Sequence, residues 1–223
     1  MARMTASDMI TLVRLGISET SETLSDTQIL RLLNQSYLEL AGSIDHRELD
    51  ASTSITTSAS TAEYTLSASD VLRITNITDT TNGIRQREIS AYQYDQYTQS
   101  ETPTGAPVYY FYSGSSGQYK QLTFYPTPDG TYTLAVRYQK KPAELVTTPS
   151  ATSPIIHELW DDSIVHRAVS RAWMLLGDTG KAGQWRDMAK ANDQIAAMAT
   201  RQSSVVPIRP GSRMAEAIRN AKV

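Results

Sequence analysis

Two histidine–aspartate pairs have the spacing at which side chains meet on one face of a helix. His157 and Asp161 are four residues apart, as are Asp162 and His166. Imidazole and carboxylate groups can ligate a metal ion, but a site needs a third converging ligand, and neither pair has an identifiable one. Charged residues near a helix N-terminus explain both pairs more simply. We therefore predict no metal site and no cofactor, and we expect His166 to be a packed or interface residue.

Other groups that could support catalysis are equally weakly arranged. The stretch 113–117 alternates serine and glycine like a phosphate-binding loop, but it lacks the Gly-Lys-Ser/Thr ending and lies between two predicted strands, which favours a hairpin loop. Asp45, Glu48 and Asp50 could act as the acid pair of a glycoside hydrolase, yet acids are common where a helix ends. No Ser-His-Asp order can be argued for the many serines. We predict no catalytic residues and no enzyme.

The composition excludes several further classes of protein. The chain has 223 residues, a formal net charge of −2 and no cysteine. The acidic balance gives no general attraction to DNA or anionic lipid. Without cysteine there are no disulfides and no cysteine-ligated zinc, so stability must come from packing or assembly. No apolar run approaches the roughly 20 residues of a membrane span, and no signal peptide is recognisable, so we expect a soluble protein with no membrane partner.

Helical periodicity at the N-terminal end predicts two helices that could position a functional surface. The first is centred on residues 9–15 and is expected to stop at Gly16. The second is expected to begin after Ser25, which forms a capping box with Gln28, and to end at Gly42 as the residue after its C-cap.

The C-terminal end is predicted to form two more helices followed by a basic extension. Ser153 and Pro154 predict the start of a helix over 154–176, which is apolar on more than one face and therefore needs several partners. A second helix is expected over about 183–200. Residues 201–223 carry five basic side chains and one acidic one, and their end is a weak amphipathic helix of the kind that binds a partner.

The middle of the chain has the period of β-strands and is rich in Ser, Thr and Tyr. The stretch 122–139, "LTFYPTPDGTYTLAVRYQ", predicts a hairpin around Pro128, Asp129 and Gly130, and Asn82-Gly83 predicts another. A short helix is expected near Tyr94 and Tyr97. The predicted strands are 52–57, 62–66, 71–78, 83–88, 107–113, 117–125 and 131–139.

These elements predict an α+β fold. The N- and C-terminal helices (1–49 and 146–200) are expected to form one helical bundle domain, with a central antiparallel sheet or sandwich inserted over 50–145 and a C-terminal extension over 201–223. Tyrosines are common on the half-buried faces of small sheets and at protein interfaces. We expect four of them to form an exposed docking surface on the sheet: Tyr119, Tyr125, Tyr132 and Tyr138.

Several segments, taken in order, resemble one known family. "ETLSDTQILRLLNQSYLELA", "GAPVYYFY", "LTFYPTPDGTYTLAVRYQKKPAEL" and "IIHELWDDSIVHRAVSRAWMLLGD" resemble the head-to-tail adaptor proteins of tailed bacteriophages, also called head-completion or connector proteins, over about residues 5–200. The resemblance implies a structural virion protein at the head–tail junction, assembled in the host cytoplasm. It implies a ring under the portal, most often dodecameric, that joins the head to the tail and leaves an axial channel for the genome. DNA would pass without sequence-specific binding.

The resemblance also assigns expected roles to parts of this chain. The C-terminal extension would dock onto the portal, and the sheet would meet tail proteins. For portal docking we select Arg209, Arg213, Met214, Ile218, Arg219 and Lys222. For helix packing and the ring interface we select Leu159, Trp160, Ile164 and Trp173. Two alternatives stay open: a carbohydrate-recognising or tail-fibre-like β module that uses the tyrosines, and a virion-associated peptidoglycan hydrolase that uses Glu48 and Asp50.

Overall fold

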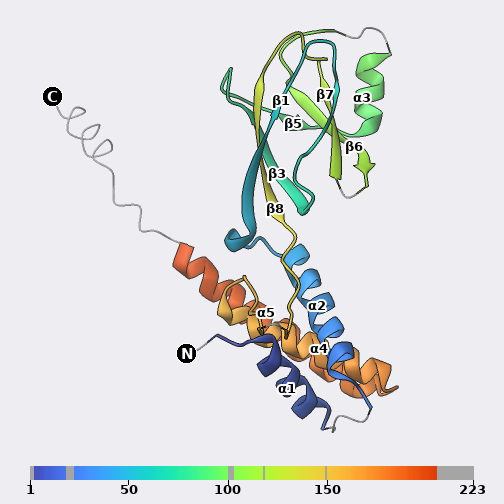
Figure 1. Cartoon of the computed structure of the whole chain (residues 1–223), viewed down its shortest axis with the longest axis vertical. Helices are drawn as coiled ribbons and strands as arrows, with labels where there is room; N and C mark the ends of the chain where they lie inside the picture. The colour runs from blue at the N-terminus through green and yellow to red at the C-terminus, as the bar shows by residue number, and fades with distance from the viewer. Residues whose placement is uncertain (1–2, 19–22, 100–102, 118, 149, 205–223) are drawn as a thin grey trace, which may run out of the picture. The chain divides into compact units, whose positions relative to one another are not determined.

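The structure is a computed structural model that describes residues 3–18, 23–99, 103–117, 119–148 and 150–204 (Figure 1). Within these residues it contains five α-helices and two four-stranded β-sheets, which confirms the predicted α+β fold class. The chain divides into two compact units. We call residues 7–33 and 158–204 the helical unit, and residues 3–6 and 34–157 the β unit. In the described ranges, no helix is both long enough and apolar enough to cross a membrane.

The helical unit is built from α1 (Ala6–Ile17), the first turns of α2 (Asp26–Ser43), the 3₁₀ turn η2 (Glu158–Trp160), α4 (Asp161–Leu175) and α5 (Thr179–Ser204). The two C-terminal helices pack against each other along their length. The core of this unit is formed by apolar side chains at helical spacing: Met9, Val13, Ile17, Ile29, Leu33, Trp160, Ile164, Val165, Ala168, Val169 and Ala172.

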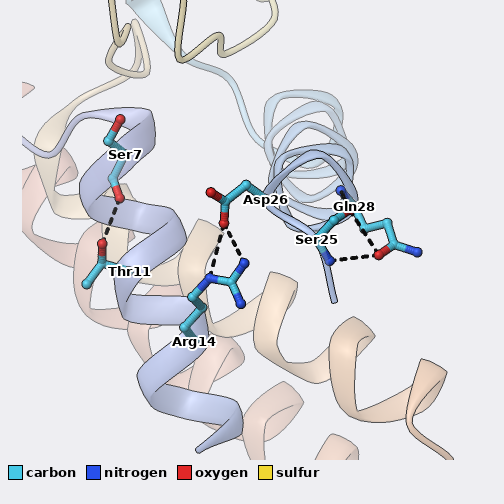
Figure 2. Close-up of polar contacts among 6 residues, drawn as sticks. All are labelled: Ser7, Thr11, Arg14, Ser25, Asp26 and Gln28. Carbon is cyan, nitrogen blue, oxygen red and sulfur yellow. Dashed lines mark hydrogen bonds and ion pairs between the residues drawn. The ribbon is translucent and has the colours of Figure 1, made fainter. Parts of the chain in front are cut away.

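The start of α2 agrees with the sequence prediction, but its end does not. The backbone N–H of Ser25 donates to Gln28 Oε1 at 2.8 Å, and the Gln28 N–H donates to Ser25 Oγ at 3.3 Å, which confirms the capping box (Figure 2). Gly42 was expected to end α2, but the helix continues through it to Ser43. Similarly, α1 passes through Gly16 and ends at Ile17, before Ser18 adopts a φ of 52°.

The third predicted helix starts later than expected, at Asp161 rather than at Pro154. The segment before it is held in irregular conformation by hydrogen bonds within the β unit. The N–H of Thr152 donates to the Val146 carbonyl at 2.9 Å, and the Ile155 N–H donates to the Tyr37 hydroxyl at 2.7 Å. These bonds occupy donors that a helix start would otherwise leave unpaired, so tertiary contacts override the Ser-Pro signal.

The β unit is a sandwich of two sheets around one core. Sheet A has the order β1-β8-β3-β4, with all pairs antiparallel. Its strands are β1 (Asp50–Thr56), β8 (Thr133–Lys140), β3 (Val71–Asp79) and β4 (Ile84–Arg85). Sheet B has the order β2-β7-β6-β5, with β5 and β6 parallel. Its strands are β2 (Glu63–Thr65), β7 (Tyr119–Tyr125), β6 (Tyr109–Ser116) and β5 (Arg87–Glu88).

Both sheets contribute to a shared core, and two further elements lie at its margins. The buried core residues are Ile55, Leu66, Val71, Ile77, Tyr110, Leu122, Phe124, Leu134, Val136 and Tyr138. The 3₁₀ turn η1 (Arg47–Leu49) leads into β1, and the short helix α3 (Ala91–Thr98) begins with a second capping box between Ser90 and Gln93.

The predicted hairpin over 122–139 is wrong. Its two strands, β7 and β8, lie in different sheets, so the Pro-Asp-Gly segment carries the chain from sheet B to sheet A. Two side-chain bonds fix this crossing: the Thr57 hydroxyl donates to the Gly130 carbonyl at 2.9 Å, and the Tyr132 hydroxyl donates to Asp129 at 2.6 Å. Alternating apolar residues predict a half-buried strand but do not say which strand is its neighbour.

Two other hairpin predictions are confirmed. Strands β3 and β4 pair through Asp79 and Ile84, and Gly83 in the turn has a φ of 71°. The connection is four residues long rather than two, because the Asp79 carboxylate accepts the backbone N–H of Thr81 and thereby widens the turn. The serine–glycine stretch 113–117 belongs to the hairpin between β6 and β7, as expected.

Candidate interaction surfaces

Helix α5 has two apolar faces. One face is covered by α4 and consists of three alanines spaced seven residues apart, each 1% exposed: Ala182, Ala189 and Ala196. The other face, which we call the α5 stripe, consists of Met188, Ala191, Ile195 and Met198, and all four are exposed. Ile195 and Met198 are each 65% exposed. At about 100° per residue, the stripe lies on a different side of the helix from the alanines.

A second exposed apolar patch lies at the C-terminal end of α4. It consists of Met174 and Leu175, which are 52% and 65% exposed, and we call it the α4 end patch. The Met174 sulfur lies 3.5 Å from a guanidinium nitrogen of Arg186. Arg186 and Ile195 are nine residues apart and therefore lie on opposite sides of α5. The α4 end patch therefore lies beside Arg186, whereas the α5 stripe is on the side of α5 opposite to Arg186.

The residues predicted for helix packing and the ring interface divide between the core and the surface. Trp160 and Ile164 are 1% and 0% exposed, so both pack inside the helical unit and do not lie on its surface. Trp173 is half-buried, and its indole N–H donates to the Gly16 carbonyl at 3.3 Å. Leu159 is 43% exposed. Of the four selected residues, Leu159 alone is exposed, and contact between copies stays a prediction.

Helix α1 is anchored to the rest of the helical unit by an ion pair and by a close approach. The Arg14 guanidinium binds the Asp26 carboxylate at 2.5 Å and so joins α1 to the start of α2 (Figure 2). A Cβ on Gly16 would lie 2.9 Å from the Val169 side chain, which is tighter than van der Waals contact. Glycine therefore lets α1 approach α4 closely, and this role explains why it occurs inside the helix.

Polar side chains between α4 and α5 pair with one another. Arg167 and Asp193 form an ion pair at 2.5 Å, and each side chain is only 17% exposed. His166 Nδ1 lies 3.1 Å from the Asn192 amide nitrogen, and its ring packs on Trp185 with centroids 5.1 Å apart. Burial lowers the pKa of His166, against an opposing effect of Asp162. His166 is therefore a packed residue, as predicted.

The acidic residues considered for chemistry do not form a recognisable centre. Asp45 forms an ion pair with Arg73, Glu48 lies in η1, and Asp50 is the first residue of β1. In the part of the chain that the structure describes, no three His, Asp or Glu side chains are grouped so that they could hold a metal ion.

Four tyrosines of the β unit serve to attach α3 to sheet B. Five aromatic side chains form this α3 cluster: Tyr94, Tyr97, Tyr109, Phe111 and Tyr125. Tyr97 stacks on Tyr125 with centroids 5.5 Å apart, and Tyr94 packs on Phe111 at 4.6 Å. Burial, with Asp95 as a secondary cause, raises the pKa of Tyr94. The cluster gives these rings a structural role that the sequence did not reveal.

The four tyrosines predicted to form a docking surface do not share one surface. Tyr138 is 7% exposed and belongs to the sandwich core, so its selection is wrong. Tyr125 is in the α3 cluster, and Tyr132 lies before β8 and donates to Asp129. Only Tyr119 is among the exposed large side chains, at 38%. The prediction placed all four on the strands 117–125 and 131–139 of one hairpin, but these strands lie in different sheets.

The residues predicted to dock onto the portal lie outside the described residues. They are Arg209, Arg213, Met214, Ile218, Arg219 and Lys222, and the described part of α5 ends at Ser204. Their role stays a prediction from charge and amphipathic pattern.

Comparison with known proteins identifies the family. No curated protein matches the chain. Residues 4–211, which are most of the chain, match the family model described as SU10 adaptor protein. The match extends over both the helical unit and the β unit, and it confirms the resemblance to phage head-to-tail adaptors. The chain belongs to the SU10 adaptor protein family, and it is a structural adaptor protein of a bacteriophage, placed at the head–tail junction of the virion.

Proposed function

We propose that copies of this chain form a closed ring between the portal and the tail, dodecameric as in most of the proteins it resembles, with an axial channel for the genome. The observation that carries this proposal is that the helical unit exposes two separate apolar patches, the α5 stripe on α5 and the α4 end patch on α4. In a ring, each subunit contacts its two neighbours through two different surfaces. A single self-complementary patch would instead give a two-fold dimer. The α5 stripe and the α4 end patch provide the two surfaces that a ring requires.

The same proposal accounts for the amount of apolar surface on the helical unit. Scattered single apolar residues are normal on a protein surface, but Met188, Ile195 and Met198 form a continuous stripe at helical spacing. A neighbouring copy would remove this stripe from water. Burial of one large aliphatic side chain contributes about 1.5–3 kcal/mol, so each contact gains several kcal/mol before the cost of association.

A lysine at the centre of the stripe tests the ring interface. Ile195→Lys places a charge where the neighbour would pack, and it should keep the protein folded because Ile195 is 65% exposed. Gln194→Lys is the matched control, since Gln194 is the adjacent exposed residue and is already polar. We expect Gln194→Lys to form rings with the portal, as the wild type does, and Ile195→Lys to remain monomeric. Equal assembly of both variants, measured by mass photometry, would show that the stripe is not an interface.

The other parts of the chain have proposed partners on either side of the ring. The basic C-terminal extension, residues 201–223, would bind an acidic groove of the portal, because it carries five basic side chains and one acidic one. The β unit would contact tail proteins. A net charge of −2 would discourage adhesion of DNA as the genome passes through the channel. The tyrosines of the α3 cluster pack on one another, which does not favour their use as a carbohydrate-binding face.

A further inference from the structure

The two sheets of the sandwich differ in how their edges end. Strand β1 forms one edge of sheet A and is seven residues long, without a break in its register. The other edge strands are short: β2 has three residues, and β4 and β5 have two each. The free part of β3 beyond β4 carries two register shifts, and such bulges discourage edge pairing. Strand β1 is therefore the one long, regular edge in the described sheets.

The register shows which backbone groups of β1 face away from its sheet. The Thr57 N–H donates to the Tyr132 carbonyl at 2.9 Å, so this pair is hydrogen-bonded. In an antiparallel ladder, bonded and non-bonded residues alternate. Residues 51, 53 and 55 therefore bond to β8, and Ser52, Ser54 and Thr56 direct their N–H and C=O groups outward. A second bond supports this assignment: the Thr80 N–H donates to the Thr133 carbonyl. The backbone groups of Thr133 therefore point toward β3, and they do not bond to Thr56, the residue opposite Thr133 on β1.

The outward backbone groups of Ser52, Ser54 and Thr56 have no partner in the described chain. Among the described residues, the other backbone bonds of the strand go to β8, except that the Asp50 N–H at its first position donates to the Arg47 carbonyl. The one loop contact of the strand is between side chains, where the Thr53 hydroxyl lies 3.1 Å from the Ser67 hydroxyl, and it leaves these outward backbone groups open. Natural proteins protect such edges with Lys, Pro or a bulge, and β1 has none of these. Its only charged residue is Asp50, at the first position. The edge has the properties of a site for strand addition.

We propose that β1 is a docking site for an extended segment of a tail protein, which adds to sheet A as a fifth strand. This inference rests on the proposed adaptor function. The backbone groups of Ser52, Ser54 and Thr56 would supply three donors and three acceptors. Side chains of the added strand would alternate: small or apolar ones beside Ile55, on the core side, and polar ones beside the exposed Ser52 and Ser54.

A second copy of the chain is a poorer partner for this edge. In a ring, β1 of one copy would have to pair with a different edge strand of the next copy. The other described edge strands are too short or are bulged, so they do not match β1. Pairing of β1 with β1 would be two-fold and would not build a ring. The partner is therefore a different protein, and within the adaptor's proposed position it is the tail component.

The test removes one outward backbone N–H of β1 and keeps the hydrogen bonds between β1 and β8. Ser54→Pro deletes a donor that β8 does not use, and its ring blocks an approaching strand; proline is tolerated at such edge positions. Ser54→Ala is the matched control, since it keeps the backbone donor. Ser52→Pro repeats the test at the next outward position, in case Ser54→Pro changes the circular dichroism or melting temperature of the purified protein. Heads of the phage that encodes the chain, carrying each variant, are mixed with purified tails and counted by electron microscopy and by plaque titre.

We expect heads with Ser54→Ala to acquire tails like the wild type. Heads with Ser54→Pro or Ser52→Pro should retain the adaptor but remain tailless, with a titre at least tenfold lower. Tails on the proline-variant heads would overturn the inference. Folded proline variants that fail to join the head would also overturn it, because the edge would then pair on the head side. Absence of the wild-type chain from the head–tail junction would instead contradict the proposed function.

Discussion

Replacement of Gly16 by alanine tests whether α1 is held by close contact with α4. The new Cβ would lie 2.9 Å from one Val169 methyl group, 3.1 Å from the other and 3.5 Å from the Trp185 ring. Carbon atoms pack best at about 3.5–4.0 Å, so Val169 must shift by roughly half an ångström or more. Val169 is 0% exposed and β-branched, and such a side chain has little room to move.

The size of the effect follows from two opposing contributions. Overpacking of a core costs roughly 1–3 kcal/mol. Alanine in a helix is favoured over glycine by about 1 kcal/mol. The net loss for Gly16→Ala is therefore about 0–2 kcal/mol, which alone is a weak test. Gly183→Ala provides the control, because Gly183 lies inside α5 with no atom within 4 Å of an added Cβ. Gly183→Ala should raise the free energy of unfolding by about 1 kcal/mol. The free energies of unfolding of Gly16→Ala and Gly183→Ala should therefore differ by roughly 1–3 kcal/mol.

Urea unfolding followed by tryptophan fluorescence measures this difference in the right place. All three tryptophans, Trp160, Trp173 and Trp185, lie in the helical unit. Val169→Ala removes the two clashing methyl groups, so Gly16→Ala should be less harmful in that background by about 1 kcal/mol or more. The reasoning fails if Gly16→Ala and Gly183→Ala stabilise the protein equally, or if Val169→Ala leaves the effect of Gly16→Ala unchanged.

Two further predictions concern a helix cap and the α3 cluster. Asp178 accepts the Lys181 backbone N–H at 2.9 Å at the start of α5, and Asp178→Ala should lower the free energy of unfolding because the cap is lost. That hydrogen bond is the main cause that lowers the pKa of Asp178, so its stabilisation is present at neutral pH and disappears as the pH falls below about 4. Urea unfolding from pH 7 to pH 3 measures the difference in unfolding free energy between the wild type and Asp178→Ala. This difference should shrink as the pH falls below about 4. A constant difference would refute the capping role. Tyr97→Ala removes the stacking on Tyr125 and should accelerate amide hydrogen exchange in α3, whereas Tyr92→Ala, at a position 70% exposed, should not. Unchanged exchange in Tyr97→Ala would show that the cluster does not hold the helix.

Features that depend on neighbouring residues could be predicted from the sequence. The capping box of Ser25 and Gln28 and the β3–β4 hairpin at Gly83 are examples. The period of the apolar residues also placed the helices at the ends and the strands in the middle of the chain, because burial on one face requires that period.

Features that depend on tertiary partners could not be predicted in the same way. The turn around Asp129 has the composition of a hairpin, but strand pairing is decided by the sandwich as a whole. Gly16 has the residue type of a helix end, and only the approach of Val169 shows its packing role. Likewise, the outer edge of β1 exists only because β8 takes the position beside it.

The candidate interface was predicted only in part for the same reason. Trp160 and Ile164 were selected as large apolar residues of a long helix, and both are used inside the helical unit. The sequence predicted a second helix over about 183–200 but did not show which of its apolar residues face α4 and which, as in the α5 stripe, stay exposed. When a helix has two apolar faces, the sequence alone does not show which face packs inside the subunit and which stays exposed.

The most direct test of the adaptor function is electron microscopy of purified portal rings mixed with this chain. Two forms should be compared: the full chain and a chain that ends at Ser204. The full chain should add a ring of subunits below the portal, coaxial with its channel, and the shortened chain should remain folded but leave the portal bare. Portals that stay bare with the full chain, while the protein stays monomeric, would contradict the adaptor ring. Rings formed equally by the shortened chain would contradict the portal-binding role of residues 205–223.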